Sequence, residues 1–180
     1  MANELIALLA EGAAEQAILD VLLDNDKLIY NREELLNEEI LRERSATRFQ
    51  RRYLGLSFSK KIKIYRILDS KGEQFKLGKA YQQNISNIIN LYTTPEIEIL
   101  FVILHHDYNN YNNYTKKQKT KLKPSIYVKQ KYSDLQHVKN YHDVYRFWNS
   151  QPDQLVIVLK EYACLSVHDV EQTIASLLRN

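Results

Sequence analysis

The chain has 180 residues, a length typical of one domain with its own apolar core. Its 25 basic and 22 acidic residues give a formal net charge of +3, too small to indicate a nucleic-acid-binding protein by itself. The single cysteine, Cys164, excludes an internal disulfide and a cysteine-rich zinc site, and we expect it to be a small buried side chain. No basic leader and no stretch of about 18 apolar residues is present, so we expect a cytoplasmic protein without a membrane partner.

The first predicted unit is a strand followed by a helix. Residues 4–10 are almost continuously apolar, which indicates a strand covered on both faces of a parallel sheet. Over residues 14–22 the apolar positions recur every three or four residues, which predicts a helix that packs back on the sheet. Glu11 and Gly12 stand at the junction, where glycine permits a tight turn and a close ligand. Glu15 follows in the first helical turn, where a carboxylate also suits the helix dipole.

Two further segments continue the alternation of strands and helices. Residues 27–30 are predicted to form a short strand, and residues 32–54 have helical spacing with a break near Ser45. Residues 61–69 are rich in β-branched side chains and predict a strand that ends on Asp69. A loop and a short helix are expected after it.

The third unit repeats this order. Residues 86–94 predict a strand, and Pro95 is well placed in the first turn of a helix that we expect to continue to residue 108. Glu98 and His105 are seven residues apart and would share a face of this helix. A carboxylate therefore follows a predicted strand in three places.

The second half of the chain has a different composition. Residues 109–124 are polar and rich in Lys, Tyr and Asn, which predicts a long loop. Residues 125–180 are predicted to be a helical region packed on the same domain as the α/β core at 1–108. Helical patterns in this region cover residues 141–149, 152–165 and 167–180.

Alternating strands and helices predict an α/β fold with a mainly parallel sheet. Sites in such sheets form beyond the carboxyl ends of the strands, where Glu11, Asp69 and either Glu96 or Glu98 are expected to converge. Neighbouring carboxylates repel one another unless a cation neutralises them. Mg²⁺ binds oxygen ligands and is usually held by one or two carboxylates together with substrate phosphates. The pattern therefore favours phosphoryl transfer or phosphodiester hydrolysis with Mg²⁺ or Mn²⁺.

Two segments resemble known families. The segment AEGAAEQAIL is similar to the opening of the TOPRIM fold, which topoisomerases, bacterial primases and OLD-type nucleases share. The segment TTPEIEILFVILHHDY, residues 93–108, resembles the TOPRIM-like RloB family of phage-defence and abortive-infection proteins. The resemblance covers roughly residues 4–131 and implies a TOPRIM-like, Rossmann-like sheet flanked by helices.

The resemblance also implies roles for individual residues. It makes Glu11 the TOPRIM glutamate, a metal ligand or general acid-base group, and Asp69 a second metal ligand. Glu98 would match the helical glutamate of the RloB family, with His105 nearby. In RILDSKGE, however, Lys71 stands where TOPRIM proteins carry a second aspartate.

Two functions follow as expectations. The first is a metal-dependent nuclease in phage defence, with catalytic Glu11, Asp69 and Glu98 and a metal held by Glu11, Asp69 and Glu15. The second, which Lys71 favours, is a non-catalytic, degenerate TOPRIM-like adaptor that binds nucleic acid or a partner protein, in association with a DNA restriction-modification system. Residues expected to contact the substrate are Gly12, Lys71, His105, Lys116, Lys117 and Lys119.

Overall fold

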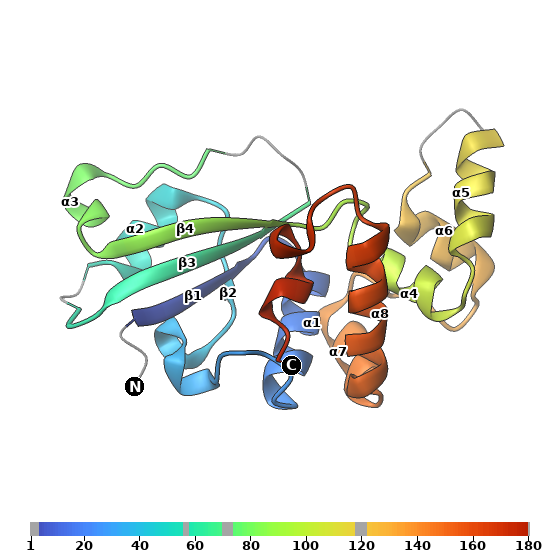
Figure 1. Ribbon diagram of the computed structural model, residues 1–180, viewed down its shortest axis with the longest axis horizontal. Coiled ribbons are helices and arrows are strands. Elements are labelled where there is room, and N and C mark those ends of the chain that lie inside the picture. The colour runs from blue at the N-terminus through green and yellow to red at the C-terminus, as the bar shows by residue number, and fades with distance from the viewer. Residues whose placement is uncertain (1–3, 56–57, 70–73, 118–121, 180) are drawn as a thin grey trace.

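The sheet at the centre of the fold has four parallel strands in the order β2-β1-β3-β4. The computed structural model describes residues 4–55, 58–69, 74–117 and 122–179. The strands are β1 (Glu4–Ala10), β2 (Leu41–Arg42), β3 (Lys61–Leu68) and β4 (Ile85–Tyr92), with helices around them (Figure 1). The predicted α/β class with a mainly parallel sheet is thus confirmed.

The apolar run of β1 is explained by its central position. Alternate side chains of a strand point to opposite faces of the sheet. Ile6 and Leu8 belong to one core cluster, whereas Ala7 and Leu9 belong to a second cluster on the other face. Because both faces are covered, every position in the middle of β1 must be apolar.

The larger core lies between the sheet and the helices from both ends of the chain. Helix α1 (Ala13–Asp24) packs beside α7 (Tyr141–Asn149), and α4 (Ile99–Leu104) packs beside α8 (Pro152–Leu165). Tyr141 on α7 ties the first pair by donating a hydrogen bond to Asp20 Oδ2 at 2.9 Å. The predicted helices at 141–149 and 152–165 are confirmed.

The smaller core covers the other face of the sheet. Helix α2 (Ala46–Tyr53) buries Phe49 and Tyr53 there, and the short helix α3 (Lys79–Gln82) follows the loop beyond β3. Gln50 links the two helices, because its Oε1 accepts a hydrogen bond from the Gly78 N–H at 2.9 Å. The loop and short helix expected after β3 are present at residues 74–82.

The helical spacing predicted over residues 32–54 is wrong for the part before Ser45. Two 3-10 turns (Arg32–Glu34 and Leu36–Glu38) and the two-residue strand β2 replace it, and α2 begins only after Ser45. Ser45 caps α2 because its Oγ accepts a hydrogen bond from the Arg48 N–H at 3.3 Å. The predicted break near Ser45 is therefore confirmed.

The segment at 27–30 does not join the sheet. Leu28 forms only an isolated antiparallel bridge with Leu178. That bridge belongs to a C-terminal stretch with two 3-10 turns, Val170–Gln172 and Ile174–Leu177, where we predicted a helix over 167–180. Ile174, Leu177 and Leu178 are buried, against α8 and the loop after α1, whereas Val167 and Val170 are exposed.

The polar segment at 109–124 is also different from its prediction. Its first part forms α5 (Tyr108–Lys117), which is followed by α6 (Pro124–Lys131), and residues 118–121 lie outside the described residues. Tyr111 fixes α5 because its hydroxyl donates to Leu122 O at 2.6 Å and its ring packs edge-on against Tyr127. Tertiary contacts of tyrosines, not aliphatic spacing, thus stabilise this helix. Figure 1 shows α5 and α6 at the end of the molecule far from α2 and α3.

Cys164 is exposed on α8, which corrects the expectation that it is buried. The helix buries the face formed by Leu155, Val158, Leu159, Tyr162 and Ala163, and Cys164 falls beside that face. In the described ranges, no helix is long and apolar enough to cross a membrane.

Candidate functional site

Glu11 and Asp69 meet at the carboxyl end of the sheet. Each residue follows directly on its strand, and β1 and β3 are neighbours in parallel register, with Ala10 beside Ile67. Glu11 Oε2 accepts a hydrogen bond from the Asp69 backbone N–H at 2.9 Å. The Glu11 side chain is only 5% exposed. The structure therefore brings these two predicted residues together.

Arg44 lies on the other side of Glu11. It comes two residues after β2, the neighbour of β1, and its Nη2 forms an ion pair with Glu11 Oε1. Burial raises the pKa of Glu11, and the nearby charge of Asp69 raises it further. The Arg44 guanidinium and the hydrogen bond from Asp69 N–H oppose this rise, since both stabilise the carboxylate.

Gly12 makes room for the carboxylate of Glu15. The backbone of Gly12 is extended, with φ −118° and ψ 173°, a conformation open to any residue. A Cβ at this position would lie 2.4 Å from Glu15 Oε2, well inside van der Waals contact. The expected tight turn is therefore not what requires glycine here. The space left by the missing side chain is filled by the Glu15 carboxylate, which folds back over the start of α1.

Glu15 and Glu98 form the buried acidic part of the site. Burial raises the pKa of Glu15 to about 7, and the charges of Glu98, Glu11 and Asp69 contribute to the rise. Glu98 immediately precedes α4 and is 4% exposed. Burial raises its pKa as well, although Lys139 Nζ lies 3.5 Å from Glu98 Oε1 and opposes the rise.

Apart from Glu11, these side chains line one cavity of about 180 Å³, between the carboxyl end of the sheet and the start of α1 and α4. Its wall has acidic groups from several elements and two cations, one from the segment after β2 and one from the segment before α7. Such a wall offers an anionic ligand two cations and offers a hard cation several carboxylate oxygens. The lining residues are Gly12, Ala13, Ala14, Glu15, Arg44, Asp69, Glu96, Glu98 and Lys139.

A second hollow of about 190 Å³ adjoins this cavity. The two hollows share Asp69 and Glu96 in their walls, and Lys123 lies 3.5 Å from Glu96 Oε1. A third cation therefore stands beside the carboxylates, at the start of α6. An extended anionic ligand would find positive charge on both sides of Asp69.

The donor atoms suit Mg²⁺ or Mn²⁺ in type. Glu11, Glu15 and Asp69 offer only oxygen, as hard divalent cations prefer. Among the residues that the structure describes, no three Asp, Glu, His or Cys side chains are close enough to one another to enclose a metal ion. Mg²⁺ is usually held by one or two carboxylates with substrate phosphates, so Glu11 and Asp69 fit that mode of binding. An ion at Glu11 would take over the charge neutralisation that Arg44 provides.

The other predicted contacts are not at the cavity. The His105 ring stacks on Tyr132 at 4.1 Å, at the far end of α4 from Glu98. Lys116 and Lys117 are exposed at the end of α5, outside both cavity walls. Lys71 and Lys119 lie outside the described residues.

Two residues of the site, Arg44 and Lys139, were not predicted. Arg44 follows a strand of only two residues, too short for a periodic signal. Lys139 is 41 positions after Glu98, and only the tertiary fold brings them together. The unusual density of arginine at 42–52 is the one sequence signal that pointed toward Arg44.

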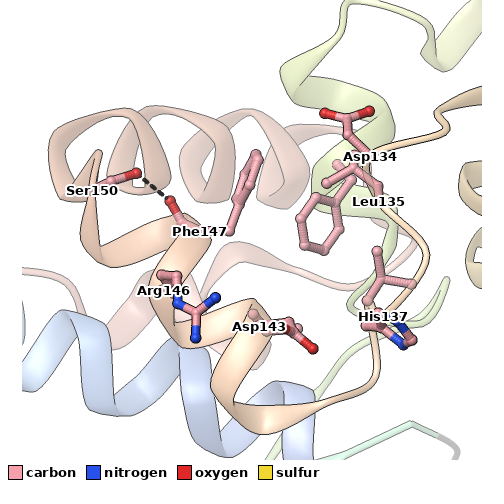
Figure 2. A pocket seen from close by; sticks show the side chains of 10 residues that line it. Asp134, Leu135, His137, Asp143, Arg146, Phe147 and Ser150 are labelled. Carbon is pink, nitrogen blue, oxygen red and sulfur yellow. Dashed lines mark hydrogen bonds between the residues drawn. The ribbon is translucent and has the colours of Figure 1, made fainter.

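A separate hollow of about 350 Å³ lies beside α7, and Figure 2 shows its side chains. Apolar side chains, among them Leu135 and Phe147, form much of its wall, with Asp134, Asp143 and Arg146 around them. None of the predicted site residues lines it. It therefore does not belong to the carboxylate site.

No protein-family model, curated protein or solved structure matches this chain.

Proposed function

We propose that the chain is a metal-dependent phosphodiesterase of TOPRIM-like type that acts on nucleic acid, with a role in phage defence. The observation that carries the proposal is the hydrogen bond from the Asp69 backbone N–H to Glu11 Oε2, which holds the Glu11 carboxylate beside Asp69, a residue of the cavity wall. Together with the resemblance of residues 4–131 to TOPRIM-like proteins, this arrangement supports phosphodiester chemistry better than a purely structural role.

The residues have distinct tasks in this proposal. Glu11 and Asp69 hold Mg²⁺ or Mn²⁺, which when bound polarises the phosphate and activates a water. Glu15 has a pKa of about 7, so at neutral pH it exchanges a proton readily and is suited to general acid-base work. Arg44 and Lys139 stabilise negative charge on the phosphate oxygens. Glu98 holds Lys139 at the cavity, since the two side chains form an ion pair.

One observation favours the second candidate, a non-catalytic adaptor. Arg44 already neutralises Glu11, and Lys139 already neutralises Glu98, so the acidic groups have internal partners. In an adaptor these ion pairs would be permanent, and the cavity would serve the fold. In the phosphodiesterase, Arg44 must leave Glu11 when the ion binds.

Arg44→Gln separates the two candidates. Mg²⁺ and Mn²⁺ binding is measured by calorimetry on the wild type, Arg44→Gln, Glu11→Gln and Asp69→Asn. Cleavage of single- and double-stranded DNA and RNA is followed in parallel. The phosphodiesterase predicts that Arg44→Gln binds the ion at least ~10-fold more tightly, since a competing cation is removed. Glu11→Gln and Asp69→Asn should lose both ion binding and cleavage.

The control is Lys60→Gln, which removes a cation at the opposite end of the sheet. It should bind the ion as the wild type does. If the folded wild type and Arg44→Gln both bind neither ion, with and without an oligonucleotide, the phosphodiesterase is refuted and the adaptor is favoured.

A further inference from the structure

A dense group of exposed arginines surrounds Arg44 in the sequence. Between positions 42 and 52 the sequence has five arginines and one carboxylate, Glu43. Four of the arginines, with Glu43, line a hollow of about 450 Å³ between β2 and α2. We call these four residues the arginine patch: Arg42, Arg48, Arg51 and Arg52.

The orientation of α2 fixes the outer part of the patch. The helix buries Ala46, Phe49 and Tyr53 in the smaller core. Arg48, Arg51 and Arg52 are therefore left on the exposed side, three and four residues apart. Like charges at this spacing repel one another along a helix. The arrangement lowers the stability of an isolated α2, and an anionic ligand would relieve the repulsion.

The patch has little internal neutralisation. Arg48 pairs with Glu43, at 3.1 Å from Nε to Oε1. Across the described part of the chain, none of Arg42, Arg51 and Arg52 forms an ion pair. Arginine presents a planar fork of N–H donors that matches phosphate oxygens. The hollow is thus a surface on which several guanidinium groups can contact phosphates at once.

Arg44 links the patch to the carboxylate cavity along the sequence. Arg44 stands between Arg42 and the start of α2 in the sequence; it lines the cavity and forms the ion pair with Glu11. Five arginines thus follow one another in the sequence from β2, through the partner of Glu11, to the exposed side of α2. Nucleic acid carries phosphates at a regular spacing and can contact such a row over its length.

We propose that the arginine patch binds the phosphate backbone of a nucleic-acid strand and guides it into the carboxylate cavity. The proposal rests on the proposed function, because it supplies the substrate path for that site. The patch replaces the substrate contact expected from the sequence at Lys116 and Lys117, since these two lysines lie at the end of α5 and outside the cavity walls. Binding through the patch depends on charge and geometry and not on base sequence.

The test uses fluorescently labelled DNA and RNA oligonucleotides, single- and double-stranded, titrated with the full chain at several salt concentrations. Arg51→Gln/Arg52→Gln is compared with Lys60→Gln/Lys61→Gln, which removes the same charge from exposed residues at the amino end of β3. Each lost phosphate contact weakens duplex binding by about 8-fold at 0.1 M salt relative to 1 M salt. The arginine variant should therefore bind about 60-fold more weakly, and its log Kd against log salt slope should fall by about 1.8.

Glu11→Gln keeps the two proposals distinguishable. It should fail to cleave the oligonucleotides, and adding Arg51→Gln/Arg52→Gln to it should still weaken binding and lower the salt dependence. If the wild type binds oligonucleotides through the patch but never cleaves them, the proposal of a binding patch is supported and the proposal of a phosphodiesterase is refuted. Wild-type affinity in a folded arginine variant would overturn the patch, whatever the cleavage result. Preference for poly-glutamate over every oligonucleotide would also overturn it and would indicate an acidic protein partner.

A second measurement needs no variant. The arginine Nε–H resonances of the wild type are recorded while oligonucleotide is added. Shifts confined to the patch and Arg44 are expected. Shifts confined to other surfaces would contradict the proposal.

Discussion

Glu15→Gln should stabilise the protein at alkaline pH and leave it unchanged at acid pH. Glu15 is 8% exposed, and burial is the first cause of its raised pKa, about 7 against an ordinary 4.5. One pKa unit corresponds to about 1.36 kcal/mol, so the ionised Glu15 destabilises the fold by about 3 kcal/mol above pH 7. Glutamine is neutral at every pH and nearly the same in shape, so it avoids this cost.

The sign follows from proton binding. Between pH 4.5 and 7 the folded state holds a proton on Glu15 that the unfolded chain has released, so stability falls as the pH rises through this range. Below pH 4.5 both states are protonated and the variant gains nothing. Above pH 7 the difference between variant and wild type is complete.

Urea unfolding at a series of pH values from 4.5 to 8.5 measures this difference. At pH 8.5 the variant should be more stable by about 3 kcal/mol, or about 6 to 12 °C in Tm for a chain of this size. Taking the difference between the two proteins cancels the contribution of titrating groups that do not interact with Glu15, such as Asp20. A stability difference that is absent at pH 8.5, or equal at all pH values, would refute the assignment of a raised pKa to Glu15.

Two further predictions concern the same fold. Gly12→Ala should move the Glu15 carboxylate, because the added Cβ would lie 2.4 Å from its Oε2, and an NMR titration should then show a shifted Glu15 pKa. Gly55→Ala is the control, because the nearest atom to its added Cβ is 3.9 Å away. A Glu15 signal that titrates in Gly12→Ala as in the wild type would contradict the reasoning. Asp107→Ala should lower the free energy of unfolding by about 3 kcal/mol, since Asp107 accepts from Tyr127, Tyr132 and Asn110 at 2.7, 3.0 and 2.6 Å. Denaturation beside the exposed control Asp134→Ala measures this, and equal stabilities would show that the Asp107 network contributes nothing.

The strands with long apolar signals were predictable. Residues 4–10, 61–69 and 86–94 were each recognised from composition, and their parallel arrangement follows from the helices between them. That arrangement alone placed Glu11 beside Asp69, because adjacent parallel strands end at the same edge. The part of the site that depends on this edge could therefore be predicted from sequence.

Elements held by distant contacts were not predictable. Strand β2 is recognised only by its pairing, which consists of Leu9 with Leu41 and Ala10 with Arg42. The apolar spacing around it imitates a helix, which explains the wrong prediction there. Helix α5 was instead predicted to be a loop, because it buries only Tyr111 and therefore has no apolar stripe. The cations of the site, Arg44 and Lys139, are also brought to their partners by contacts between residues far apart in the sequence.

The central position of β1 has a consequence for synthesis of the chain. This strand is made before the other strands of the sheet, yet the first residue of its main partner, β3, comes 57 residues after the first residue of β1. Until residues 61–68 have left the ribosome, an apolar strand with unpaired edges is exposed on the nascent chain. Such edges recruit other strands and favour aggregation. Slow synthesis through residues 11–60 should therefore lower the yield of folded protein, and a chaperone that binds the emerging β1 should restore it.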